Sequence, residues 1–239
     1  MGGHRFETKP LYQQLRDVLS ERIATGEWKP GVALPNEGDL AREFGVSSGT
    51  MRKALNLLES EHLLTRLQGR GTFVRDQSSG ELSVRFSNVR GPDGKRISAP
   101  VRSSTVTKDV ANKTDCARLE LQEQCPIYRI RRVRTYANRP FIVEDAVLPA
   151  SLFPNLTKVN DPSHRIVVLA QQHGILLGKA EEIVSIGSAS PEVAKTLKIT
   201  PSSPIVVLDR VVRAIDGRPV EWRIGHCDLG ELSYLAEMS

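Results

Sequence analysis

The chain has 239 residues, of which 39% are hydrophobic and 26% charged, and its formal net charge is +5 at neutral pH. This length accommodates two domains with real cores. No apolar run approaches the roughly 20 residues of a membrane span, and no apolar segment follows the first residues, which argues against a membrane anchor or signal peptide. Cys116, Cys125 and Cys227 lack metal-ligand spacing and fit a reducing compartment. We therefore expect a cytoplasmic protein without metal or cofactor.

The first expected element is a helix that begins after Lys9-Pro10 and ends near Gly26. Its apolar residues recur at helical spacing and are expected to face a domain core. They are Leu11, Leu15, Val18, Leu19 and Ile23.

Two short helices joined by a tight turn follow. Asn36 is placed to cap the first helix, and Gly45 ends it. Ser47 or Ser48 caps the second helix, whose apolar residues again recur at helical spacing. These residues are Met51, Ala54, Leu55 and Leu58, with Leu57 as a further candidate. The pattern predicts a helix-turn-helix, whose second helix can enter the DNA major groove, or else an ordinary helical hairpin in a core.

A hairpin is expected next, with strands over 63–66 and 72–74 around Gln68-Gly69-Arg70-Gly71. The glycines permit close backbone approach to a phosphate, and Arg70 places a positive charge at the tip. Because such a hairpin is poor core material, it favours a winged helix-turn-helix over a pair of core helices.

A dense set of residues spans this region: Leu11-Tyr12-Gln13-Gln14-Leu15, Gly26, Pro30-Gly31, Leu34-Pro35, Glu37, Leu40-Ala41, Phe44-Gly45-Val46-Ser47, Thr50, Arg52, Ala54-Leu55, Leu58, Gly69 and Gly71-Thr72-Phe73-Val74. In these residues the region resembles the DNA-binding domain of the GntR superfamily of bacterial transcription regulators. The resemblance implies a winged helix-turn-helix domain over 1–76 that binds double-stranded operator DNA.

The start of the second helix of the motif and the hairpin are the expected DNA contacts. Arg52 is the first candidate for a base edge, because a guanidinium can make a bidentate contact to guanine. Ser47, Thr50 and Lys53 are candidates for phosphate contacts, with a solvated charge as the alternative for Lys53. The complete predicted set is Ser47, Ser48, Thr50, Arg52, Lys53, Arg66, Gly69 and Arg70.

The net positive charge is not concentrated in this domain. Acidic and basic residues nearly balance there, and the excess of basic residues lies between Arg85 and Arg139. Many members of the superfamily carry arginine where Gly38 and Ser48 stand here, so the operator sequence cannot be taken from relatives. DNA affinity has to come from local placement of basic side chains, and part of the remaining charge is available for an anionic ligand.

Polar, small residues at 77–80 predict a linker over 77–82, followed by a second domain over 83–239. A weak internal repeat is visible in that domain, since Leu119 before Pro126 parallels Leu197 before Pro204. A helix followed by a hairpin, twice, predicts an antiparallel sheet with short helices on one side, an α+β domain. The expected elements are strands over 100–107, 126–136, 141–148, 183–188, 205–215 and 220–226, and helices over 111–119, 163–173 and from 190.

Arg132 and Arg134 share one face of the second expected strand. Arginines two positions apart on a strand can converge on one phosphate or carboxylate group. The alternative is that they are solvated, or paired with Glu144, Asp145 or Glu221.

A second, less dense set of residues runs from residue 83 to the C-terminus. It comprises Tyr128, Ile130, Arg132, Arg134, Arg139-Pro140, Glu144, Leu148-Pro149, Gly174-Ile175, Leu197, Arg210 and Pro219-Val220-Glu221. In these residues the region resembles the UTRA sensor domain of the HutC-type GntR subfamily, whose fold is shared with chorismate lyase.

The resemblance implies an effector pocket on the sheet. Arg132 and Arg134 would bind an anionic group, Glu144 and Glu221 would accept hydrogen bonds, and Ser163 at a helix N-terminus would bind a phosphate or carboxylate. The sequence departs from the subfamily at His164-Arg165, and over residues 225–228, so the ligand chemistry need not match that of relatives.

Two classes of function fit these patterns. The first is a homodimeric transcription regulator, a repressor, whose operator affinity is controlled by a small anionic metabolite. The second is an enzyme acting on a small carboxylate or phosphate, suggested by the lyase-like fold and by His164, His173 and His226. An enzyme would need a nucleophile, metal cluster or cofactor loop at recognisable spacing. None of these is visible in the sequence, so the regulator is preferred.

Overall fold

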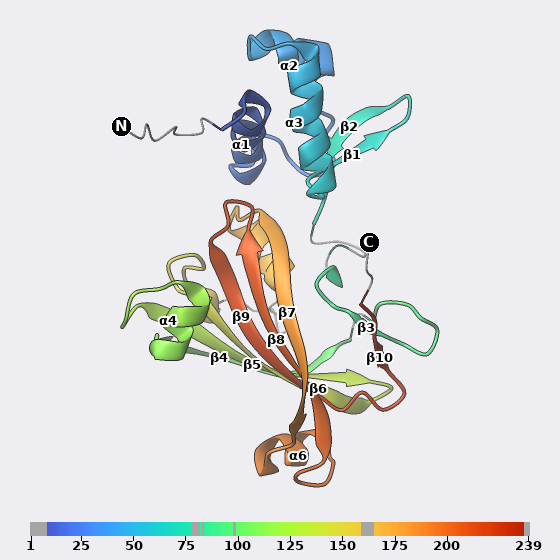
Figure 1. The fold of residues 1–239 in the computed structure, drawn as a ribbon, viewed down its shortest axis with the longest axis vertical. Coiled ribbons are helices and arrows are strands. Elements are labelled where there is room, and N and C mark those ends of the chain that lie inside the picture. The colour runs from blue at the N-terminus through green and yellow to red at the C-terminus, as the bar shows by residue number, and fades with distance from the viewer. Residues whose placement is uncertain (1–8, 78–81, 83, 98, 159–164, 237–239) are drawn as a thin grey trace, which may run out of the picture. The chain divides into compact units, whose positions relative to one another are not determined.

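The computed structural model describes residues 9–77, 82, 84–97, 99–158 and 165–236, and the chain divides into two compact units, Met1–Ser79 and Gly80–Ser239 (Figure 1). Most of the linker expected over 77–82 lies outside the described residues. The two units are described separately below.

The first unit consists of three helices followed by a hairpin (Figure 1). Its elements are α1 (Leu11–Ala24), α2 (Glu37–Glu43), α3 (Ser48–Ser60), β1 (Leu64–Leu67) and β2 (Gly71–Val74). The expected order of helix, helix-turn-helix and hairpin is therefore confirmed.

The core of this unit contains most of the apolar residues expected from helical spacing. Leu19, Leu40, Met51 and Leu58 are fully buried. Three residues of the stripe expected on α1 are not, because Leu11 is 56% exposed, Val18 is 45% exposed and Ile23 is partly exposed. Helical spacing predicts which residues share a face, but the width of the buried part depends on how much of that face the other helices cover.

Side-chain caps set the start of each motif helix. The Asn36 side chain accepts a hydrogen bond from the backbone N–H of Asp39 at 2.9 Å, at the start of α2. Ser47, not Ser48, caps α3, and its Oγ lies 3.2 Å from the Thr50 backbone nitrogen. Between the helices, Gly45 has a φ of +62°, a left-handed conformation that suits glycine.

The hairpin pairs Leu64 with Val74 and Leu67 with Gly71. Its first strand begins one residue later than expected. The turn has positive φ at Gly69 (+71°) and Gly71 (+110°), which explains the glycine at both positions.

The second unit is built on one six-stranded antiparallel sheet (Figure 1). In spatial order its strands are β4 (Val101–Val110), β5 (Pro126–Tyr136), β6 (Arg139–Pro149), β9 (Pro219–Cys227), β8 (Pro204–Ala214) and β7 (Leu177–Ser188). The other elements are β3 (Val89–Arg90), α4 (Lys113–Leu119), η2 (Leu156–Lys158), α5 (Ile166–Gln172), α6 (Pro191–Leu197) and β10 (Ser233–Tyr234). The α+β class is confirmed.

The strand order reflects the internal repeat. One half runs β4, α4, β5, β6 and the other runs β7, α6, β8, β9, and the halves meet where β6 pairs with β9. Both repeat helices end on a residue in the left-handed conformation, Glu120 (φ 54°) and Lys198 (φ 60°). Both also have a side-chain cap: Asn112 forms a capping box with Asp115, and Ser190 caps α6.

The two faces of the sheet are covered differently. On one face, Ile127 and Val133 of β5 belong to clusters that include residues of α4 and α6, and we call this the helix face. On the other face, Tyr128 and Ile130 belong to the cluster that includes α5. Because side chains alternate along a strand, Arg132 and Arg134 share this second face.

Candidate functional site

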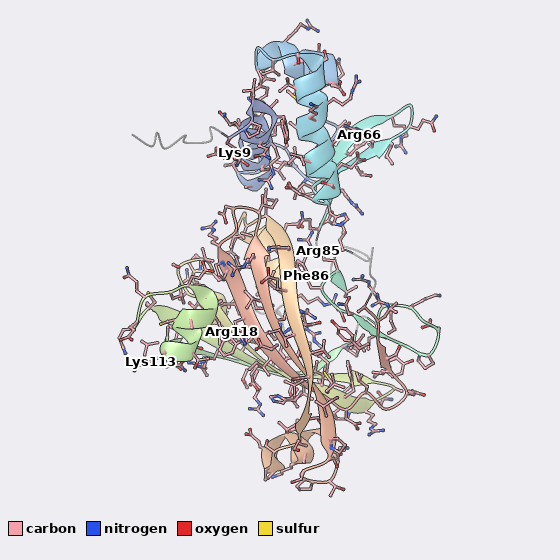
Figure 2. All side chains as sticks on the ribbon, viewed as in Figure 1. Lys9, Arg66, Arg85, Phe86, Lys113 and Arg118 are labelled. Atoms are coloured by element: carbon pink, nitrogen blue, oxygen red, sulfur yellow. The ribbon has the colours of Figure 1, made fainter. Side chains whose placement is uncertain are left out.

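The predicted DNA contacts all lie in the first unit. Ser47 precedes α3, and Ser48, Thr50, Arg52 and Lys53 belong to its first turns. Arg66 is on β1 (labelled in Figure 2), and Gly69 and Arg70 form the turn of the hairpin. Their contacts to DNA remain predictions.

Two of these arginines are paired with glutamates. The Arg52 guanidinium contacts Glu37 at the start of α2, with Nε 3.0 Å and Nη2 2.9 Å from Oε1. Arg66 Nη1 lies 3.0 Å from Glu59 Oε2 on α3. Exposed ion pairs of this kind contribute little net stability.

Lys53 has a specific neighbour within the unit. Its Nζ lies 5.9 Å from the centroid of the Tyr12 ring of α1, which is within the range of a cation–π contact. Lys53 is therefore more than a solvated charge, because it also contacts the Tyr12 ring.

The second unit contains a cavity on the face of the sheet opposite the helix face. Its wall is formed by the sheet, by the segment 84–97 with Ala99, and by α5, and most of the lining is apolar. Phe86, labelled in Figure 2, contributes to it. The charged lining residues are four arginines and one carboxylate: Arg134, Arg165, Arg210, Arg223 and Glu144.

Glu144 is the centre of the ion pairs at this cavity. Its Oε1 lies 2.7 Å from Arg223 Nη1, and its Oε2 lies 2.8 Å from Arg134 Nε and 3.3 Å from Arg132 Nε. The Glu144 side chain is only 4% exposed. Arg132 and Arg134 are therefore both paired with Glu144, as one of the alternatives from the sequence had it.

The pairing determines the charge state of these groups. Burial alone would raise the pKa of Glu144, but Arg223, Arg134 and Arg132 hold it well below its usual range. Burial also lowers the pKa of Arg132, against the charges of Glu144 and Glu221. A guanidinium is not deprotonated in proteins, so Arg132 stays charged.

Arg132 and Glu221 lie beneath the cavity and do not line it. Both are about 1% exposed, and Arg132 Nη2 lies 3.5 Å from Glu221 Oε1. Within the described part of the chain, the buried Glu221 Oε2 has no hydrogen-bond partner. Of the predicted effector residues, Arg134 and Glu144 line the cavity, while Arg132 and Glu221 support them.

Arg210 links the cavity to the C-terminal strand. Its Nε donates to Glu182 Oε1 on β7 at 2.6 Å. Tyr234 of β10 donates its hydroxyl to the other oxygen of Glu182 at 2.6 Å, and Asn88 donates to the Tyr234 hydroxyl at 3.1 Å. Because β10 pairs with β3, this chain of contacts joins β7 to the segment that covers the cavity.

The buried ion cluster carries an excess of positive charge. We define it as Arg132, Arg134, Arg210, Arg223, Glu144, Glu182 and Glu221. Four guanidinium groups oppose three carboxylates, an excess of one positive charge. A buried excess charge is costly unless a counter-charge approaches it.

The remaining predicted effector residue, Ser163, lies outside the described residues. The helix expected over 163–173 begins at Ile166 as α5, because Arg165 is its N-cap in an extended conformation, so its start lies three residues later than expected. Among the residues that the structure describes, no cluster of three or more His, Cys, Asp or Glu side chains could hold a metal ion. No helix within that part of the chain is long and apolar enough to cross a membrane.

Sequence reasoning did not include Arg165, Arg210 and Arg223 among the site residues. The internal repeat contained a signal for Arg210, which stands six residues after Pro204 as Arg132 stands six after Pro126. Arg165 precedes a helix whose position against the sheet has no signature in local sequence.

Comparisons with known proteins agree with this architecture. A model of the bacterial regulatory proteins of the gntR family matches residues 11–74, and a model of the UTRA domain matches residues 95–229. The mannosyl-D-glycerate transport/metabolism system repressor MngR of Escherichia coli is 31% identical over 90% of both chains.

Two further proteins are similar over most of the chain. The histidine utilization repressor of Pseudomonas putida is 26% identical over 84% of this chain and 81% of its own length. The crystal structure of PhnF from Mycobacterium smegmatis has a TM-score of 0.56 at 21% identity and covers 94% of this chain and 98% of its own, a likeness of fold. The family and the named relatives are transcription regulators, not enzymes. The chain belongs to the GntR family of bacterial transcription regulators, of the HutC type with a UTRA domain.

Proposed function

We propose that this protein is a repressor that binds its operator as a homodimer and whose operator affinity is controlled by a small anionic metabolite. The operator contacts are the start of α3 and the β1–β2 hairpin. The metabolite occupies the cavity of the second unit. Regulators of this family bind operator DNA and small-molecule effectors. The proposal adds which residues make these contacts and that the ligand is negatively charged.

One observation carries the choice of an anion: the cavity is lined by four arginines and a single carboxylate. A carboxylate or phosphate entering it would approach Arg134, Arg210 and Arg223 and neutralise the excess charge of the buried ion cluster. Glu144 is held ionised, so it accepts hydrogen bonds from hydroxyl or amino groups of the same ligand. A relative named for a mannosyl-D-glycerate system agrees with a hydroxylated carboxylate.

Ligand and operator are coupled through the chain that joins the two units. The segment 84–97 lines the cavity and lies close in sequence to the predicted linker. A ligand that displaces this segment changes the arrangement of the two DNA-binding units in a dimer and thereby operator affinity. Operator binding must then oppose or favour ligand binding by the same factor.

The test of the ligand site is thermal unfolding with D-glycerate, inorganic phosphate and neutral glycerol. At a ligand concentration 100 times Kd, binding stabilises the folded protein by about 2.7 kcal/mol. We expect stabilisation by at least one anion and none by glycerol. Arg134→Ala should abolish the shift, measured from its own ligand-free baseline.

Arg131→Ala is the matched control, since Arg131 comes from the same strand but pairs on the helix face with Glu192 at 3.0 Å. It should keep the anion-induced shift. An equal loss in both variants, or an equal shift with glycerol, would contradict the anion site.

Arg52→Ala should weaken binding to DNA selected from randomised duplexes while keeping the anion-induced shift. Loss of both would refute the assignment of two separate sites.

A further inference from the structure

The contact between Arg52 and Glu37 joins the two helices of the helix-turn-helix. Glu37 is the first residue of α2, and Arg52 projects from α3 with 65% of its side chain exposed. Glu37 is more covered, at 29% exposure, and the Asn36 cap fixes the backbone beside it. The carboxylate is therefore the better fixed partner of the pair.

The contact uses one edge of the guanidinium. Nε lies 3.0 Å and 3.3 Å from the two Glu37 oxygens, and Nη2 lies 2.9 Å from Oε1. An arginine has five N–H donors, and this arrangement engages the Nε edge. The opposite edge, with one N–H from each Nη, is the edge that fits O6 and N7 of guanine.

We propose that Glu37 is a specificity-determining residue of DNA recognition, which orients Arg52 so that its two-donor end faces a guanine. The inference rests on the proposed base contact of Arg52 and adds a positioning role for Glu37. The carboxylate acts in two ways. It restricts the rotamers of a flexible side chain before DNA binds, and its negative charge discourages a phosphate from taking the same guanidinium.

The hairpin offers a matched comparison. Arg66 is also paired with a glutamate, but the contact there is made by Nη1, 3.0 Å from Glu59 Oε2. Glu59 also accepts the backbone N–H of Arg66 at 3.3 Å, so it belongs to the junction of α3 and β1. This contact is made through Nη1 and not through the Nε edge, so the pair differs in geometry from that of Arg52 and Glu37.

The experiment is selection from randomised duplexes with sequencing, followed by competition binding, for the full-length wild type and the variants Arg52→Ala, Glu37→Gln, Glu37→Asp and Glu59→Gln. We expect the wild type to select guanine at one pair of symmetric positions and Arg52→Ala to lose that preference. Glu37→Gln should reduce discrimination at the same positions about tenfold, within the range of a bidentate contact. Glu37→Asp should do likewise, because a side chain shorter by one methylene cannot hold the same edge.

The other positions of the selected sequence should not change in the Glu37 variants, and Glu59→Gln should keep the guanine preference. Circular dichroism and unfolding curves establish that each variant is folded. If Arg52→Ala selects the wild-type sequence, the base contact of Arg52 is wrong and the inference falls with it. If Arg52→Ala loses the preference but both Glu37 variants keep it, only the role of Glu37 is refuted.

Discussion

Arg223 of β9 and Glu144 of β6 form an ion pair across neighbouring strands, with 2.7 Å between Nη1 and Oε1. Glu144 also faces Arg132 and Arg134, so a single carboxylate opposes three guanidinium groups. The removal of this carboxylate would leave several buried positive charges without their main partner.

Glu144→Gln should therefore destabilise the protein by about 3–5 kcal/mol, the usual cost of removing one partner of a buried ion pair. Urea unfolding at neutral pH measures the change. Glu181→Gln is the control, because Glu181 pairs with Lys179 at an exposed edge of the sheet and such pairs contribute little to stability. Equal destabilisation by the two substitutions would contradict the central role of Glu144.

Alternation along β5 placed Arg132 and Arg134 on one face, and the structure confirms this arrangement. What alternation could not show is depth. Arg134 lines the cavity, whereas Arg132 is fully buried beneath it. The difference arises from the parts that cover the sheet, the segment 84–97 and α5, which have no periodic pattern that would reveal their position.

In the first unit, too, some features could be predicted from the sequence and others could not. The caps and turn glycines of the motif follow from local chemistry, and their positions were predictable from residues such as Asn36 and Gly45. The exposure of Leu11 and Val18 was not, because it depends on the area of α1 that the other helices cover. The partners of Arg52 and Arg66 also depend on tertiary placement, as Glu37 lies 15 residues from Arg52 in sequence.

Ser47→Ala should destabilise the first unit by about 1 kcal/mol, since it removes the hydrogen bond accepted from the Thr50 backbone N–H at the start of α3. Ser48→Ala should have almost no effect on stability, because Ser48 follows the cap and its side chain is exposed. Thermal unfolding of both variants distinguishes the two serines. A larger effect from Ser48→Ala would contradict the assignment of the cap.

Tyr234→Phe should loosen the contact between β10 and β3. The substitution removes the hydroxyl that donates to Glu182 and accepts from Asn88. A hydrogen bond to a charged group contributes about 1.5–3 kcal/mol, and a 1.4 kcal/mol loss corresponds to about tenfold faster local opening. Hydrogen–deuterium exchange should therefore accelerate at Leu235, whose amide donates to the Asn88 carbonyl.

Tyr12→Phe is the control for this measurement, because Tyr12 belongs to α1 in the first unit. It should leave the exchange at Leu235 unchanged. If Tyr234→Phe also leaves that exchange unchanged, the hydroxyl does not fasten β10.

His226 makes the stability of the protein depend on pH. Burial lowers the pKa of its imidazole, Asp145 opposes that shift, and Arg131 adds to it. Its Nδ1 is buried and lacks a hydrogen-bond partner among the described residues. In the unfolded chain the imidazole titrates at about 6.5.

Below that pH the unfolded state binds a proton that the folded state binds less readily, so the free energy of unfolding must fall as pH falls from 7 to 5. His226→Gln, which cannot titrate there, should lose less stability over this range than the wild type. Urea unfolding at pH 7, 6 and 5 measures both.

Asp145→Asn provides the opposite test. Its carboxylate favours the charged imidazole, and burial raises the pKa of Asp145 itself, so both effects of its removal should increase the loss of stability on acidification. The two substitutions should therefore change the pH dependence of stability in opposite directions. If His226→Gln and Asp145→Asn change the pH dependence in the same direction, the buried neutral imidazole is not its source.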